Sequence, residues 1–150
     1  MAVKIPSDQI QNLQQIEAAV AGTDDANRLF IINGQINMEL GVSSPETDAY
    51  TEKKEIFTVL IGPKFTSRQF IKANATASLA KIYSKGAGGV EGNPFTDYLG
   101  ILDVDADWDD ESGQVELRIE AQVGCQGLDQ AVGINGFAFT VTILAAVPVA

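Results

Sequence analysis

The stretch LDVDADWDDESGQVELRIEAQVG, residues 102–124, alternates apolar and polar side chains on both sides of a short polar insert. Successive side chains of a β-strand point to opposite faces, so this alternation predicts two strands, each with one buried and one solvated face. The insert DDESG, residues 109–113, predicts the hairpin turn that joins them. The apolar positions are Val104, Ala106 and Trp108 in the first strand and Val115, Leu117, Ile119, Ala121 and Val123 in the second.

The same period of two recurs in four other segments, LFIINGQINMEL (29–40), EIFTVLIG (55–62), FIKANATASLAKIY (70–83) and GFAFTVTILA (136–145). The strand that ends at Trp108 extends back to Tyr98, and we expect Tyr98 and Leu102 to share its apolar face. Strands with one buried and one solvated face are typical of antiparallel sheets that pack face to face. The sequence therefore predicts a mainly β protein, a six-stranded antiparallel β-sandwich over residues 29–150.

Residues 1–28 are expected to form an N-terminal α-helix or arm. In IPSDQIQNLQQIEAAVAG (5–22), Ser7 or Asp8 is a suitable N-cap and Gly22 a suitable stop. The apolar residues of this segment form one narrow helical stripe. The stripe either packs on its own domain or pairs with copies of itself around an oligomer axis. Its members are Ile10, Leu13, Ile16 and Val20.

Composition narrows the classes of function. The 150 residues carry a net charge of −10, which disfavours nucleic acid and anionic membranes as partners. The chain has no histidine, which removes the usual general base and the commonest metal ligand. The one cysteine, Cys125, forms no internal disulfide and is interpreted as a core or turn residue rather than a nucleophile. We therefore predict no catalytic residues and no enzyme activity, and the N-terminus shows no signal-peptide pattern.

Asp103, Asp105 and Asp107 match the first half of a calcium-binding EF-hand loop. Trp108 and Gln114 then occupy the positions where that loop needs glycine and glutamate. Because the three aspartates alternate with apolar residues, a solvated strand face is favoured over a calcium site, and a basic partner is the other alternative. No other cofactor is predicted.

Three polar or glycine-rich segments, residues 41–54, 84–95 and 124–136, are expected to be long loops. Long loops in compact domains often carry binding functions. The candidate ligand or partner residues in and beside them are Tyr50, Asn93, Phe95, Tyr98 and Asp129.

The order INGQINMEL (32–40), KEIFTVLIGPKFTSRQFIKANATASL (54–79), LDVDADWDDESGQVELRIEAQVG (102–124) and GFAFTVTILA (136–145) resembles the H-type lectin-like fold. The resemblance covers residues 30–147. It implies a six-stranded sandwich that assembles as a trimer, as in invertebrate lectins and the tips of bacteriophage tail fibres. Ile143 stands where the lectins have a tryptophan, and the animal lectins' cysteine pair is missing, so no sugar-binding residue is carried over.

From these features we expect a non-enzymatic, self-assembling virion protein, either a capsid decoration protein or a tail or fibre component. It would assemble in the host cytoplasm with itself and with other virion proteins. The alternative is a lectin-like protein that binds glycans between protomers.

Overall fold

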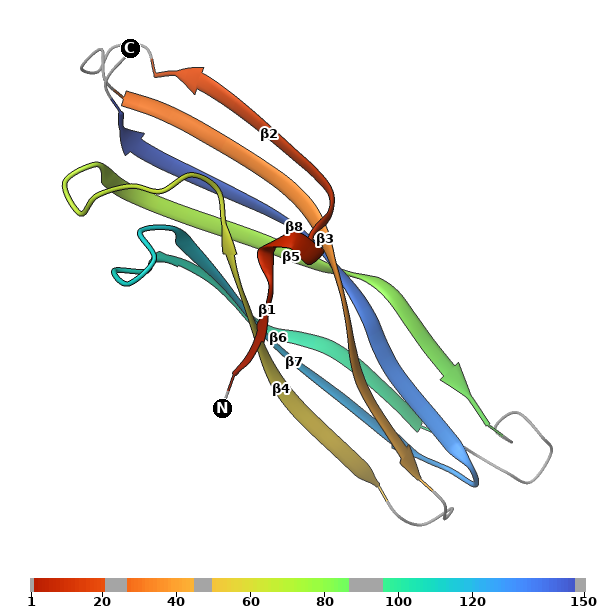
Figure 1. Cartoon of the computed structure of the whole chain (residues 1–150). Helices are drawn as coiled ribbons and strands as arrows, with labels where there is room; N and C mark the ends of the chain where they lie inside the picture. The colour runs from red at the N-terminus through yellow and green to blue at the C-terminus, as the bar shows by residue number, and fades with distance from the viewer. Residues whose placement is uncertain (1, 21–26, 45–49, 87–95, 148–150) are drawn as a thin grey trace.

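The computed structural model describes residues 2–20, 27–44, 50–86 and 96–147. Eight strands form two four-stranded sheets that lie face to face (Figure 1). Sheet A has the strand order β1-β4-β7-β6, and sheet B has the order β2-β3-β8-β5. The strands are β1 (Val3–Ile5), β2 (Gln11–Ala19), β3 (Asn27–Ser44), β4 (Thr51–Ile61), β5 (Phe70–Lys85), β6 (Thr96–Trp108), β7 (Val115–Gln126) and β8 (Gln130–Ala146).

The core lies between the two sheets and is built by the predicted alternation. Leu117 and Ile119 of sheet A and Ile32 and Phe137 of sheet B are fully buried. Phe137 meets a phenylalanine of β4, Phe57, at a ring centroid distance of 5.8 Å. All six predicted alternating segments lie in strands, β3 to β8, so the mainly β sandwich is confirmed.

The predicted N-terminal helix is wrong. Residues 3–5 form β1, parallel to β4, and after a single 3-10 turn, η1 (Ser7–Gln9), residues 11–19 form β2, antiparallel to β3. The N-terminal segment thus crosses from sheet A to sheet B (Figure 1). The helical spacing of its apolar residues was misleading because β3 offers these residues a strand partner. An irregularity between Gln11 and Gln14, where Asn12 has φ 54°, gives β2 one extra residue relative to β3.

The number of strands was also predicted wrongly, since the described residues form eight strands rather than six. Neither β1 nor β2 shows an alternating pattern: β1 has three residues, and every residue of β2 is exposed. A strand that buries neither face leaves no period-two signal in the sequence.

Two local expectations need correction. A register shift between Ile101 and Asp103 places Leu102 at an exposed position and breaks the alternation of β6. Tyr98 consequently lies on the solvated face of sheet A, and not with Val104, Ala106 and Trp108. The expected long loop over residues 124–136 is mostly strand, because only residues 127–129 separate β7 from β8.

Candidate functional site

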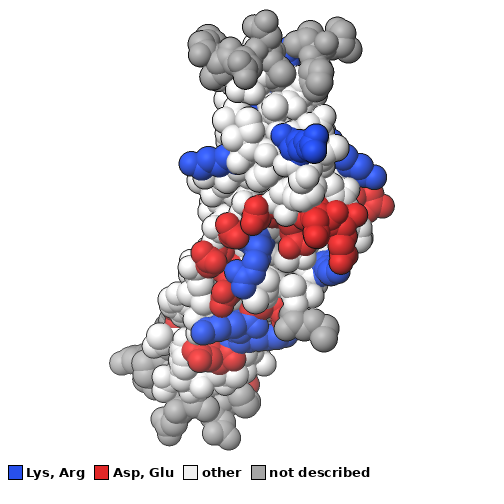
Figure 2. Space-filling model, turned by 90° about the vertical axis from the view of Figure 1, so that its left-hand side faces the viewer, with Lys and Arg blue, Asp and Glu red and all other residues white. Residues whose placement is uncertain are grey.

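The outer face of sheet A is acidic. Cross-strand pairing sets Asp103 beside Glu120, Asp107 beside Glu116, and Asp105 beside Arg118, the one cation among them. The Arg118 guanidinium lies 3.3 Å from a carboxylate oxygen of Asp103 and 3.8 Å from one of Glu120. Asp and Glu side chains accordingly form a band across one side of the molecule (Figure 2). The predicted solvated position of Asp103, Asp105 and Asp107 is confirmed.

These aspartates do not converge as metal ligands would. Among residues 2–20, 27–44, 50–86 and 96–147, no three His, Cys, Asp or Glu side chains are grouped so that they could hold a metal ion. Side chains on one face of a strand are about 7 Å apart, too far for one ion without other ligands.

The turn between β6 and β7 is organised by Asp109. Its carboxylate accepts hydrogen bonds from the backbone N–H of Ser112, at 3.0 Å, and from the Ser112 hydroxyl, at 2.6 Å. Gly113 has φ 76°, a conformation that favours glycine, and its N–H donates to the Asp109 carbonyl. The two bonds from Ser112, with a smaller contribution from the charge of Lys4, lower the pKa of Asp109 below its ordinary value. This acidic segment is therefore a structural hairpin turn, as predicted.

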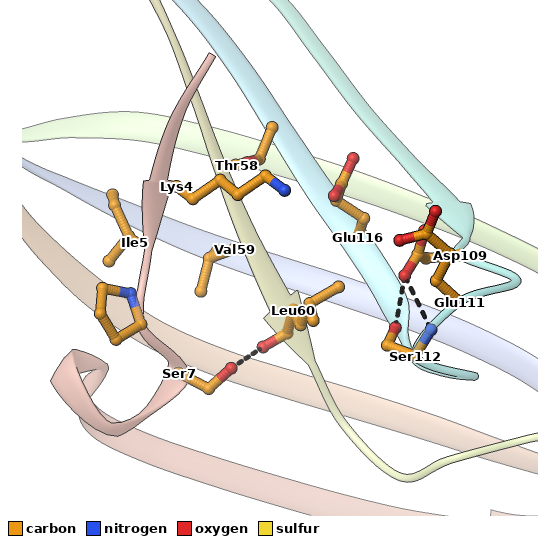
Figure 3. Close-up of a pocket in the computed structure, with 11 residues that line it drawn as sticks. Lys4, Ile5, Ser7, Thr58, Val59, Leu60, Asp109, Glu111, Ser112 and Glu116 are labelled. Carbon is orange, nitrogen blue, oxygen red and sulfur yellow. Dashed lines mark hydrogen bonds between the residues drawn. The ribbon is translucent and has the colours of Figure 1, made fainter.

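A groove of about 340 Å³ separates this turn from the N-terminal segment (Figure 3). Ile5, Val59 and Leu60 supply apolar lining, and the Ser7 hydroxyl closes one end by donating to the Leu60 carbonyl at 2.7 Å. Across the groove lie the carboxylates of Asp109, Glu111 and Glu116, with Lys4 as the one ammonium group of the lining. The lining offers carboxylates, hydroxyls and an ammonium group, which can make hydrogen-bonding and ionic contacts.

Two tyrosines lie on the outer face of sheet A at the other end of β6. Tyr98 covers Gly100 on its own strand, and Tyr50 covers Gly124 of β7, where an added Cβ atom would collide with each phenol. The rings rest on the sheet because glycine leaves the space free, and the side chains stay 47% and 40% exposed at Tyr50 and Tyr98. Partial burial and then the charge of Glu52 raise the pKa of Tyr50, which favours a neutral phenol.

Polar groups flank the tyrosine pair. The Gln122 amide donates to the Glu52 carboxylate at 2.7 Å, and Lys54 is the cross-strand neighbour of Gln122. Flat aromatic rings beside fixed amide and carboxylate groups can bind a neutral ligand that has one apolar face and several hydroxyls.

The other predicted loop residues are Asn93, Phe95 and Asp129. Asn93 and Phe95 lie outside the described residues. Asp129 is exposed in the turn between β7 and β8, with φ 52°, and its carbonyl lies against Gly86.

Cys125 belongs to a network of side-chain hydrogen bonds. Its thiol is fully buried and donates to the Gln130 carbonyl at 3.5 Å. The Gln130 amide donates to Asp97 at 2.9 Å and to the Ser84 hydroxyl at 3.1 Å, and Ser84 in turn donates to Asp97. Burial, and then the charge of Asp97, raises the pKa of Cys125, so the thiol stays protonated. The network connects β5, β6 and β8 at one end of the sandwich.

The four residues of the expected oligomerisation stripe are separated by the strand geometry. Ile10 packs against the core beside Gly34, and Val20 is half-buried just beyond β2. Leu13 and Ile16 are exposed by 53% and 58%. The feature that the sequence did not reveal is the open edge of β2, because glutamines and alanines there are compatible with either a helix or a strand.

Comparison with protein-family models, with curated proteins and with solved structures gave no match for this chain. Within the described ranges, no helix is long and apolar enough to cross a membrane.

Proposed function

We propose that this protein is a non-enzymatic, self-assembling structural protein whose copies associate through the edge of sheet B formed by β2. The observation that carries the proposal is that β2 forms an open edge of sheet B. All nine of its residues are exposed, and β3 is its partner on one side only. Such an edge presents unpaired backbone N–H and C=O groups to any strand that approaches.

The other sheet edges in the described part of the chain are protected against such pairing. β1 has three residues and includes Lys4. β6 carries the acidic row and a register shift, while β5 has three register shifts and lies alongside β6. Charges, irregularities and short strands are the usual protection of edges. The charged residues concerned are Asp103, Asp105 and Asp107 in β6 and Lys72, Lys81 and Lys85 in β5.

β2 has little of this protection. Its charged residue, Glu17, is paired within the chain with Arg28 of β3 at 3.7 Å, which reduces the charge that could repel a second strand. Its exposed apolar side chains, Leu13 and Ile16, gain burial if another strand covers them. A nine-residue edge with this little protection favours pairing with another strand.

Within this proposal, the protein is a virion component, either a capsid decoration protein or a part of a tail or fibre. The acidic outer face of sheet A supports a second contact, with a basic surface of another component of the particle. The lectin-like resemblance implies a trimer, which the mass in solution distinguishes from a dimer.

The test is the mass of the protein in solution, by sedimentation velocity at 1–100 µM. We expect an assembly for the natural chain and monomers for Ile16→Lys, which puts a charge into the edge. Thr76→Lys, on the exposed face of β5, is the matched control and should assemble normally. A natural chain that is monomeric throughout this range would refute the proposal.

The tyrosine pair favours a second candidate function, lectin-like carbohydrate binding. Tyr50 and Tyr98 give two exposed rings next to the hydrogen-bonded Gln122 and Glu52, within one copy of the chain. The test is a glycan array with the natural chain, with Tyr98→Ala, and with Tyr83→Ala as control, since Tyr83 covers glycines on the other sheet. Binding that is lost in Tyr98→Ala alone would support this function, and a blank array would exclude it.

A further inference from the structure

We infer that the occupant of the open β2 edge is β2 of a second copy, paired antiparallel about a two-fold axis that passes beside Ile16. This inference rests on the proposed self-assembly and specifies its partner and register. The two copies would form one continuous eight-stranded sheet, with two copies of sheet B joined at their β2 strands.

The backbone of β2 shows which of its groups are free. The N–H of Val20 donates to the carbonyl of Asn27 in β3, at 3.3 Å. In an antiparallel pair, residues directed toward the partner strand alternate with residues directed away. Val20, Ala18, Ile16 and Gln14 therefore direct their backbone groups to β3, and Gln15, Glu17 and Ala19 direct theirs to the open edge. This open edge offers regularly spaced hydrogen-bonding groups beyond the irregularity that ends at Gln14.

A two-fold axis normal to the sheet keeps the outer faces of both copies on the same side, so each residue must meet a residue of the same face. The registers that satisfy this condition include those with the axis beside Gln15, Ile16 or Glu17. The register at Glu17 places two carboxylates opposite each other and is unfavourable. The register at Gln15 sets Ile16 against the amide of Gln14 and moves Leu13 opposite Glu17.

With the axis beside Ile16, apolar side chains meet apolar partners and polar side chains meet polar partners. Ile16 meets its own copy on the outer face, and its neighbour within the chain on that face is Ile31 of β3. Four isoleucines then form an apolar row across the interface, which buries side chains that are exposed in one copy. On the other face, Gln15 meets Glu17 of the second copy, so its amide can donate to that carboxylate while Arg28 keeps its contact with Glu17.

Cysteine cross-linking tests the register. In this arrangement the two Ile16 residues form a pair without mutual backbone hydrogen bonds, with Cα atoms about 4.5 Å apart, within the range that a disulfide spans. The Ala18 residues are four positions out of register and about 13 Å apart along the strands, which no disulfide bridges. Both positions are exposed and on the same face, so Ile16→Cys and Ala18→Cys are matched variants, and Cys125 is fully buried in each.

We expect mild oxidation to convert most of Ile16→Cys to a covalent dimer, with at least tenfold less dimer from Ala18→Cys. If the natural chain assembles but Ile16→Cys gives no more dimer than Ala18→Cys, the register is wrong and the proposed self-assembly stands. If the natural chain is monomeric in sedimentation, both are wrong. Circular dichroism of each variant confirms that the fold is retained before oxidation.

Discussion

Trp108 connects the β6–β7 hairpin to the segment that follows β4. We expect its replacement to lower the free energy of unfolding by an amount that can be estimated from its contacts. Its indole N–H donates to two carbonyls, those of Phe65 at 3.1 Å and Gly113 at 3.0 Å. Gly113 also accepts a bond from the Phe65 N–H at 2.7 Å, so the three residues form one connection. Trp108→Phe keeps an aromatic ring in the core but removes the donor.

Two contributions determine how far Trp108→Phe lowers the free energy of unfolding. A shared hydrogen bond to partly buried carbonyls contributes about 1–1.5 kcal/mol, and after the substitution the Phe65 carbonyl lacks this donor. The smaller ring gives up roughly 40 Å² of buried apolar surface, or about 1 kcal/mol. We expect the free energy of unfolding to fall by about 2–3 kcal/mol, and Tm by about 5–10 °C for a chain of this length.

The assay is thermal unfolding followed by far-ultraviolet circular dichroism, at one protein concentration because assembly makes Tm concentration-dependent. Tyr98→Phe is the control, since the Tyr98 ring lies on the solvated face and its loss of a hydroxyl should change stability by less than about 0.5 kcal/mol. A Trp108→Phe protein as stable as the natural chain would show that the indole bonds do not hold the hairpin.

Three further outcomes follow from the same structure. Asp109→Asn should lower stability most above pH 3.8, the ordinary pKa of the carboxyl. Because the folded-state pKa is lowered, the natural chain loses this stabilisation as pH falls below that value, and urea titrations at pH 2.5 and 6 should show the two proteins converging at the lower pH. Phe137→Ala, which empties a fully buried site beside Phe57, should cost about 3–5 kcal/mol in the same titrations, and a loss under 1 kcal/mol would contradict the packing. Addition of 1 mM calcium should leave Tm unchanged, whereas a rise abolished by Asp105→Asn would establish a cation site on the acidic face.

The β-sandwich could be predicted from the sequence in those strands that bury one face, because alternate residues are then apolar. Val115 to Val123 alternate without interruption, and the structure buries every apolar member of that strand. The inward position of Trp108 and the outward position of Asp105 followed from the same rule.

The remaining features depend on contacts that leave no local pattern. β2 exists because β3 supplies its hydrogen bonds, and neither of its faces is buried. The register shift at Leu102 reverses the face of Tyr98, and a one-residue shift of this kind is invisible in composition. The placement of Tyr50 beside Tyr98 likewise depends on strand register, which sets Tyr98 opposite Gly124, the glycine that Tyr50 covers.

Association of copies through the edge of β2 can be tested by amide hydrogen exchange at Gln15 and Glu17. Their N–H groups point to the open edge, so in one isolated copy they exchange freely with water. We expect protection of these two amides at concentrations where the protein is assembled, and loss of that protection on dilution or in Ile16→Lys. Free exchange of both amides in the fully assembled protein would contradict it.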